Sequence, residues 1–561
     1  MVWTLVDNSP SPNRVFTRPL DNNELGFFYD ATFNGVADIA EHYIVETTRD
    51  SLFELSNVTR TWIALKRIFP LLGATTRETD REALGASFTI VEADLDVTRP
   101  GEVSILSATS EEEVHEFVED LLSGPRQLSP DLLSRVYIYS RKDSPGLYHA
   151  VIHTAHSIID GTASLSLIRT FFDILSLPPT THIPHLEERL ALCVGSENLN
   201  PHRDLPLARR RWRRAIGWVI HHIRNPKIQG GMSIPRRITT HTPYRLPKSK
   251  RLEITFPEEE STLIIANCRK YGTTFGAALP ILGQLGSSRL LHRRYIRGEI
   301  GKDEWEWRRI QPCNTMGPLN YRPYLYKDWY TNGGSEVVVL GINYFFLAHS
   351  FMPSVSDEWV ANNRHTLEDG APPFSALLSQ GRFVLRSNVI KQKVKEFVAH
   401  PLLFEIASFR FPGRILYRKR AGRLWMENRE GGELGEPEKD VPSVLTNDLI
   451  YHNGGASLGN IDPLRPTEYP VLPSSPLSSQ KYYPQPKTDE NVLAGKPAIR
   501  VIDSWRKLCT RPAELYFGSL TQSKKLTMFV SWDGNTYEDS VVEEWLKEAK
   551  LATHHYLCQP L

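Results

Sequence analysis

A histidine followed after three residues by an aspartate and a glycine is the feature of this sequence that most directly predicts chemistry. The hexamer HSIIDG occupies positions 156–161 of 561 residues. A neutral imidazole, with an ordinary pKa of about 6.5, is the usual general base near neutral pH. The run before it, LYHAVIHTA, is β-prone and apolar, and the run after it, TASLSLIRTFFDILS, has helical periodicity. We therefore expect His156 in a turn between a strand and a helix, acting on a hydroxyl or an amine.

Two roles are open for Asp160. It could orient the imidazole directly, as the acid does in nucleophilic triads. It could instead point away and fix the turn through an arginine. We expect Gly161 to let the backbone turn sharply where a side chain would clash. His153, three residues before His156, is expected to pack within the strand.

The rest of the chain alternates between strand-like and helix-like segments. The runs RVYIYSRKD and LYHAVIHTAHS, joined by the turn DSPG at 143–146, predict a strand pair, and EEEVHEFVEDLLSG predicts a helix ending at Gly124. Residues 33–48 are also expected to be helical. In the second half, PEEESTLIIANCRKYG and TTFGAALPILGQLGSSRLL predict helices, and KLTMFVSWDG predicts a strand before a last helix.

This mixture predicts an α/β or α+β protein with two lobes. The expected division is an N-terminal lobe at 1–202 carrying HSIIDG, a basic connection at 203–250, and a C-terminal lobe at 251–561. A long loop rich in proline and serine is expected near 462–498.

Composition excludes several classes of protein. The formal net charge of +1 is unlike a dedicated nucleic-acid binder, and no apolar stretch is long enough to span a bilayer. The five cysteines form no CxxC pair, no HExxH or P-loop sequence occurs, and the N-terminus lacks the pattern of a signal peptide. We expect a cytoplasmic enzyme with no metal and no resident cofactor.

The basic connection allows three interpretations. Its centre reads RRRWRRAIGWVIHHIR. It could be a solvated linker, a platform for phosphates, or a segment that contacts a membrane surface through tryptophans and arginines.

HTAHSIIDG resembles the HxxxDG motif of the chloramphenicol-acetyltransferase-like superfamily, which includes BAHD acyltransferases, condensation domains and fungal alcohol acetyltransferases. TTFGAALPILGQL, GPLNYRPYL and MFVSWDGNTYEDSVVEEWL resemble further segments of that superfamily, in the same order. Within it the chain is most similar to fungal secondary-metabolite O-acyltransferases of the trichothecene O-acetyltransferase group. The resemblance implies two lobes, each with a mixed sheet covered by helices, around an active-site channel.

The resemblance also implies roles for residues. His156 would be the general base for transfer from acyl-CoA, in particular acetyl-CoA, to a small-molecule alcohol in a ternary complex. Asp160 would pair with Arg322 of NYRP, and Gly161 would complete the turn. The plant DFGWG loop is absent; at a similar position GGASLGNIDPLRP contains Ser457, either an oxyanion donor or part of a plain turn. The family norm is a monomer.

Two other functions stay open. A condensation-like enzyme would take its acyl group from a carrier protein, although such domains usually have two adjacent histidines and here Ala155 precedes His156. A non-catalytic relative would bind a ligand or partner without turning it over.

Overall fold

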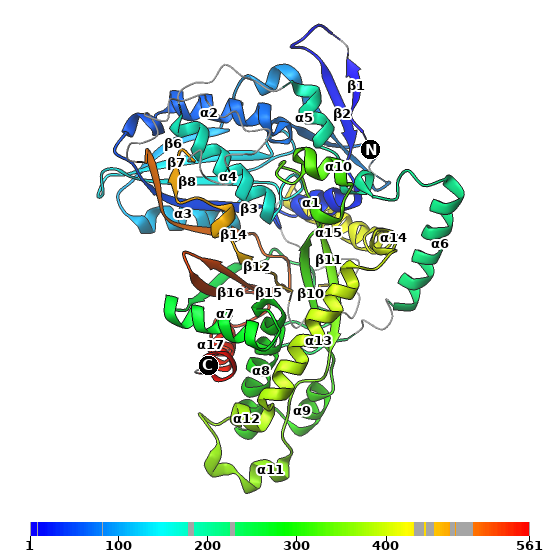
Figure 1. Cartoon of the computed structure of the whole chain (residues 1–561), viewed down its shortest axis with the longest axis vertical. Helices are drawn as coiled ribbons and strands as arrows, with labels where there is room; N and C mark the ends of the chain where they lie inside the picture. The colour runs from blue at the N-terminus through cyan, green and yellow to red at the C-terminus, as the bar shows by residue number, and fades with distance from the viewer. Residues whose placement is uncertain are drawn as a thin grey trace.

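A six-stranded mixed sheet is the framework of the upper lobe in Figure 1. The computed structural model of the chain describes residues 2–7, 9–80, 82–177, 185–224, 230–430, 443–444, 454–471, 477 and 497–559. The strands, in their order across the sheet, are β13 (Glu468–Tyr469), β14 (Ile499–Leu508), β3 (Ile39–Glu46), β8 (Leu147–Thr154), β7 (Ser134–Arg141) and β6 (Val103–Ala108). Only β6 and β7 run parallel; the other neighbours are antiparallel.

Helices cover both faces of this sheet because its strands carry apolar residues on both sides. Ile138 and Ile152 pack into the same core as α2 (Leu55–Ile68) and α4 (Gly161–Ser176). Their strand neighbours Tyr137 and Val151 pack into a second core with α3 (Glu111–Ser123). Successive side chains of a strand point to opposite faces, so the two cores lie on either side of the sheet.

A second, four-stranded sheet lies beside the first. Its order is β1 (Thr4–Asp7), β2 (Val15–Pro19), β5 (Ala86–Val91) and β4 (Thr75–Glu78), all antiparallel. Helix α1 (Asn22–Thr32) follows β2 and packs against α15 (Pro412–Glu430), and α5 (Leu186–Leu192) lies near α2.

The lower lobe is built on the sheet β12 (Ser457–Asn460), β15 (Leu515–Gln522), β16 (Lys525–Asp533) and β9 (Ser249–Thr255). Helix α8 (Phe275–Ile296) is buried along most of its length. The helices that surround or extend this core are α7 (Glu258–Lys270), α9 (Lys302–Arg309), α11 (Asp357–Asn362), α12 (Phe374–Leu377), α13 (Gln380–Val398) and α17 (Asp539–Leu557). Trp545 of α17 donates a hydrogen bond to the Gly283 carbonyl of α8 at 2.9 Å, so glycine at 283 allows the close approach.

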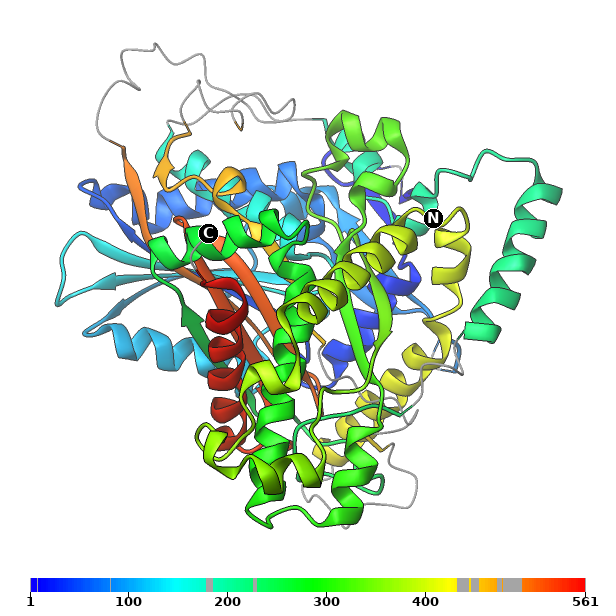
Figure 2. The ribbon, with the colours of Figure 1, turned by 60° about the horizontal axis from the view of Figure 1, so that its bottom comes forward.

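Two long-range connections join the lobes (Figures 1 and 2). Strand β14, near the C-terminus, pairs with β3 inside the upper sheet, and the hairpin β10 (Cys313–Asn320) with β11 (Ile342–His349) reaches between the lobes. The upper lobe therefore contains strands from near both ends of the chain. The lobes are not contiguous in sequence, unlike the expected division with boundaries at 202 and 251. Most of the loop expected at 462–498 lies outside the described residues.

Most predicted elements are confirmed, and one is wrong. The pair β7–β8, the helices α3, α4, α7 and α8, and the final β16–α17 unit lie where the sequence predicted them. The helix expected at 33–48 is instead strand β3, a central strand in which seven of eight residues are buried. A strand buried on both faces lacks the alternation that identifies strands in a sequence.

Candidate active site

His156 lies in the turn between β8 and α4, as its spacing from the strand and the helix predicted. The backbone N–H of His156 lies near the buried Asp38 carboxylate and, together with Arg126, opposes the effect of burial, which raises the pKa of Asp38. Asp38 in turn accepts a 2.7 Å hydrogen bond from Arg126 Nε. The turn is thus held in place from outside the HSIIDG hexamer.

The imidazole of His156 is stacked on Phe27 of α1. The ring centroids are 3.8 Å apart and the ring planes differ by 13°. Burial, and then the positive charge of Arg511, lower the pKa of His156 to about 4; its own carbonyl, Asp160 and Asp30 act in the opposite direction. At neutral pH the ring is therefore uncharged and able to accept a proton.

Asp160 faces away from the imidazole and is completely buried. Both of its carboxylate oxygens lie 2.9 Å from Arg322 Nη1, and Oδ2 accepts from the Gly341 N–H at 2.6 Å. Its Oδ1 also caps α4 by accepting from the N–H groups of Thr162 and Ala163 at 2.9 and 3.0 Å. These bonds hold the pKa of Asp160 below its usual value despite burial. Asp160 lines neither of the two cavities described below, and its contacts hold the turn and the start of α4 in place.

Arg322 completes this buried pair. It is 1% exposed, and its Nη2 donates to the Val339 carbonyl at 2.7 Å. A side chain at Gly341 would meet the guanidinium, because a Cβ built there lies 2.7 Å from Arg322 Cζ. Arg322 begins the short 3₁₀ turn Arg322–Tyr324, one residue after the end of β10. The Asp160–Arg322 pair therefore connects the β10–β11 pair to the start of α4.

Gly161 leaves space at the turn, as the expected clash implied, and it does so without a left-handed backbone. It is the first residue of α4, and it is not among the glycines with a left-handed backbone. A Cβ at this position would lie 3.2 Å from Arg506 Nη1 and 3.7 Å from Leu458. The missing side chain lets residues from β14 and β12 approach the turn.

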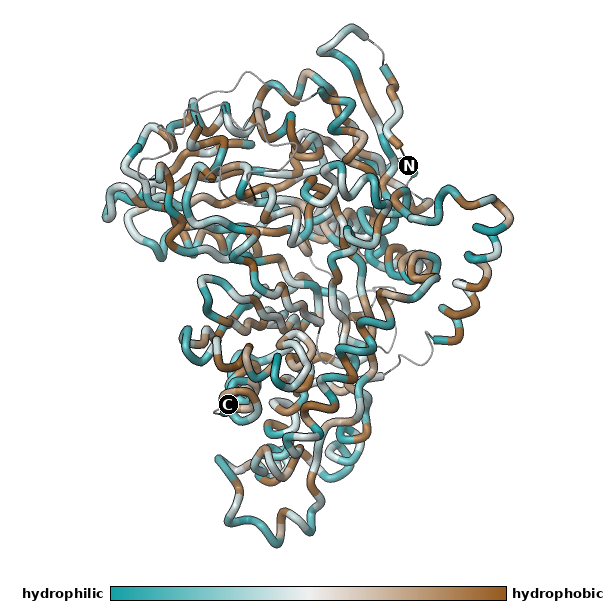
Figure 3. The backbone as a smooth tube through the Cα atoms, in the orientation of Figure 1, coloured by the Kyte–Doolittle hydropathy of each residue, from teal (hydrophilic) through white to brown (hydrophobic). Residues whose placement is uncertain are grey.

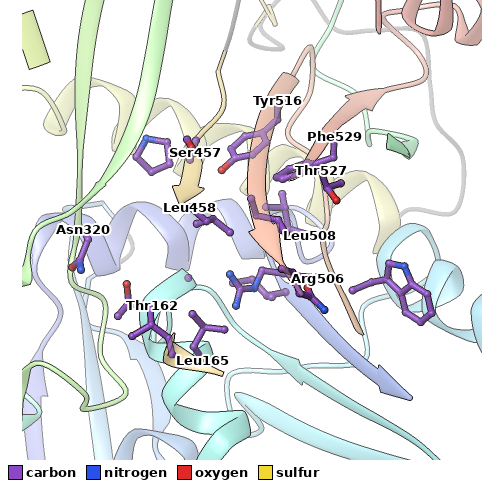
Figure 4. Close-up of a pocket in the computed structure, with 18 of the residues that line it drawn as sticks. Thr162, Leu165, Asn320, Ser457, Leu458, Arg506, Leu508, Tyr516, Thr527 and Phe529 are labelled. Carbon is purple, nitrogen blue, oxygen red and sulfur yellow. The ribbon is translucent and has the colours of Figure 1, made fainter. Parts of the chain in front are cut away.

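A cavity of about 730 Å³ lies between the lobes, and His156 is on its wall. Figure 4 shows Thr162 and Leu165 of α4 facing Ser457, Tyr516, Thr527 and Phe529 of the lower sheet, with Arg506 and Leu508 of β14 between them. The wall combines apolar side chains with ionisable ones from both lobes. Its volume suits a small molecule.

A second, smaller cavity of about 240 Å³ adjoins the first. The two share the lining residues Met316, Tyr344, Gly454, Arg511 and Glu514. Phe27, the residue on which His156 stacks, lines the smaller cavity. The smaller cavity has an excess of basic groups: its wall contains Glu514 and the arginines Arg236, Arg410, Arg414, Arg418 and Arg511. Arg418 and Arg511 are both paired with Asp30.

Ser457 begins β12 and lines the larger cavity, which it shares with His156. Its Oγ accepts a 3.0 Å hydrogen bond from Ser519 Oγ, so its own hydroxyl hydrogen can be donated. The sequence around it, Gly455 to Gly459, fits the Gly-x-Ser-x-Gly pattern of serine hydrolases. That pattern requires a strand, a sharp turn and a helix with the serine at the turn, whereas Ser457 here starts a strand.

Two residues beside His156 were missed from the sequence. Phe27 and Arg511 come from opposite ends of the chain, and no local pattern marks either one. Arg511 lies 5.2 Å from the Phe27 ring and is held by Asp30 and Glu514. Only the folded chain brings them together.

Among the described residues, one group of three combines metal-ligand types: Glu260, His554 and Cys558, in the lower lobe. None of the three lines either cavity. The absence of a catalytic metal stays an expectation from the sequence. No helix in the described part of the chain is long and apolar enough to cross a membrane.

Comparison with solved structures gives the fold. The trichothecene 15-O-acetyltransferase of Fusarium sporotrichioides superposes with a TM-score of 0.66 at 11% identity, over 99% of this chain and 98% of that chain. The condensation domain of the monacolin K polyketide synthase gives 0.55 at 11% identity, over 97% and 98%. The first condensation domain of the calcium-dependent antibiotic synthetase gives 0.54 at 11% identity, over 96% of each. No family profile matches the chain, and no curated protein matches it in sequence. The chain therefore has the two-lobed chloramphenicol-acetyltransferase-like fold.

Proposed function

We propose that the protein is an acyl-CoA-dependent O-acyltransferase that acylates a hydroxyl of a secondary metabolite, with His156 as the general base. The observation that carries this proposal is the uncharged His156 imidazole on the wall of the cavity between the lobes, while Asp160 is turned away and bound by Arg322. His156 has no enzyme nucleophile beside it, such as the serine of a hydrolase. It therefore suits direct transfer of the acyl group between two bound substrates. The trichothecene 15-O-acetyltransferase with the same fold supports acetyl as the group transferred.

In the proposed reaction His156 removes the proton from the acceptor hydroxyl as its oxygen attacks the thioester carbonyl. The new C–O bond forms a tetrahedral oxyanion, which Ser457 would stabilise by donating its hydroxyl hydrogen, since its Oγ accepts from Ser519. The C–S bond then breaks, and the protonated imidazole returns its proton to the CoA thiolate. The products are the ester and free CoA, and His156 ends the cycle uncharged.

The two adjoining cavities support separate sites for the two proposed substrates. The smaller, arginine-lined cavity suits the phosphates of CoA, because guanidinium groups bind phosphate oxygens in pairs. Arg236 and Tyr244 of the basic connection contribute to this wall, which favours the interpretation of that segment as a phosphate platform in part. The larger cavity is then left for the acceptor alcohol. On this proposal acyl-CoA is a co-substrate. The protein would act as a monomer in the cytoplasm.

Purified protein incubated with acetyl-CoA and a panel of alcohols tests the proposal. Free CoA and new acetylated masses are expected by liquid chromatography–mass spectrometry, and both should disappear in His156→Ala. His365→Ala is the matched control, because this exposed histidine lines neither cavity. Products that persist in His156→Ala would remove this residue as the essential base.

Condensation-like transfer from a carrier protein is the second candidate, because condensation domains share the fold over nearly the whole chain. The same assay with a phosphopantetheinylated acyl carrier separates the two. Acylation with the carrier alone would favour condensation-like chemistry. Acceptor binding without turnover from either donor, unchanged in His156→Ala, would favour a non-catalytic relative.

A further inference from the structure

Helix α6 (Leu207–Arg224), in the connection between the lobes, stands at the edge of the molecule (Figures 1 and 2). It packs against the short helix α14 (Leu403–Ser408). Arg213 Nε donates to Glu405 at 2.7 Å, and a Cβ on Gly217 would lie 2.8 Å from that of Glu405. The face toward the protein therefore contains Arg213 and Gly217, with Ile216 and Ile220 half-buried beside them.

The remaining apolar residues of α6 point away from the protein. Trp212, Val219 and Ile223 are 68%, 46% and 57% exposed. Their spacing of seven and then four residues places them on one side of the helix, together with Ala208 and Ala215. Brown and teal alternate along α6 in Figure 3, as expected for a helix with apolar and charged residues on different sides. In a globular protein the apolar stripe of a surface helix normally faces the core. In α6 the stripe instead faces away from the protein.

The charge around the stripe is of one sign. Between Asp204 and Glu253 the sequence contains thirteen lysines and arginines and no acidic residue, although the whole chain has a net charge of only +1. Arg209 and Arg211 flank the stripe and are exposed. Arg214 is also exposed, but it lies toward the protein, with its guanidinium 5.6 Å from the Phe409 ring. A second tryptophan, Trp218, lies toward the arginine side and is also exposed.

We propose that α6 docks on the surface of an anionic membrane, with Trp212, Val219 and Ile223 inserted at the headgroup level and the arginines bound to lipid phosphates. An exposed apolar stripe bordered by arginine and tryptophan is the pattern of helices that lie in the membrane interface. A second copy of the chain is a poorer occupant, because two α6 stripes placed face to face would bring their arginines together. The inference does not depend on the proposed acyl transfer, since α6 contributes no residue to either cavity.

Flotation of the full-length protein with lipid vesicles tests this inference. We expect the protein to float with vesicles of phosphatidylcholine containing about 30% phosphatidylserine, and not with phosphatidylcholine alone. Raising the salt concentration from about 0.1 M to about 0.5 M should weaken binding. The double variant Trp212→Ala/Ile223→Ala should bind at least about tenfold more weakly, because it removes the inserted side chains.

The matched control is Trp307→Ala/Ile310→Ala. It removes the same two residue types from exposed positions in and just after α9, where Trp307 is 51% and Ile310 53% exposed. It should bind vesicles like wild type, and both variants should keep the wild-type melting temperature. Failure of wild type to float with anionic vesicles, or equal flotation of the α6 variant, would overturn the proposal. So would a dimer seen by light scattering that the α6 variant dissociates without any lipid binding, or binding only to an acidic protein or a nucleic acid.

Discussion

Replacing Arg322 by methionine tests whether the Asp160–Arg322 pair holds the catalytic turn. Methionine keeps much of the length of the side chain but removes the charge from a site that is 1% exposed, beside a carboxylate that is 0% exposed. Removing one partner of a buried ion pair costs about 3–5 kcal/mol, because the other charge stays buried. The lower end, about 3 kcal/mol, is expected here, since Asp160 retains the N–H groups of Thr162, Ala163 and Gly341.

Calorimetry of the full chain measures this effect. For a lobe of a few hundred residues, about 3 kcal/mol lowers the melting temperature by about 6–12 °C. Asp160→Asn should also destabilise, by leaving Arg322 charged, and the double variant should lose less than the sum of the two single variants. Activity measured well below the melting temperature should also fall in Arg322→Met, because the turn that carries His156 shifts when the ion pair is lost. Arg297→Met, at an exposed position, is the control.

The Asp160–Arg322 pair also predicts how the stability of the protein changes with pH. The pKa of Asp160 is lowered in the folded state, so its contribution to stability is present above its unfolded pKa and is lost as the pH falls below it. In Arg322→Met this acid dependence should be reduced. A loss of less than about 1 kcal/mol in Arg322→Met, or strict additivity in the double variant, would refute the reasoning.

Four other changes have defined outcomes. Gly341→Ala should cost about 1–3 kcal/mol in a thermal melt, because its Cβ would press on Arg322; an unchanged melting temperature would contradict this. Ser457→Ala should lower kcat by about 10²–10³ with the KM for acyl-CoA unchanged, and an unaffected kcat in a CoA-release assay would leave Ser457 as a turn residue. The kcat/KM profile should be flat above pH 5 and fall toward acid with an apparent pKa of about 4, as His156 becomes protonated; an acid limb near 6.5 would contradict the lowered pKa of His156. Phe27→Leu should lower kcat by about tenfold through loss of the stacked ring, and Phe27→Tyr should restore it.

Local sequence determined the position of His156 and the nature of the elements around it. An apolar, β-prone strand, a turn and a periodic helix within about thirty residues place His156 in the turn, because each of these elements depends on side chains close in the chain. The N-cap of α4 by Asp160 is equally local, since it needs only the next residues of the same helix. The helix expected at 33–48 failed because β3 lies in the centre of a sheet, and its neighbours in that sheet are β14 and β8.

Tertiary structure decided what surrounds His156. Phe27, Asp38 and Arg511 come close to it from segments far apart in sequence. Phe27 stacks on its ring, and burial, followed by the positive charge of Arg511, lowers the pKa of His156. Of the two roles open for Asp160 from sequence, only the fold selects one, by bringing Arg322 to it across 162 residues. The outward stripe of α6 likewise depends on which side of the helix meets α14. Pattern and capping follow from neighbours in the chain, whereas burial and charge environment arise only when distant segments pack together.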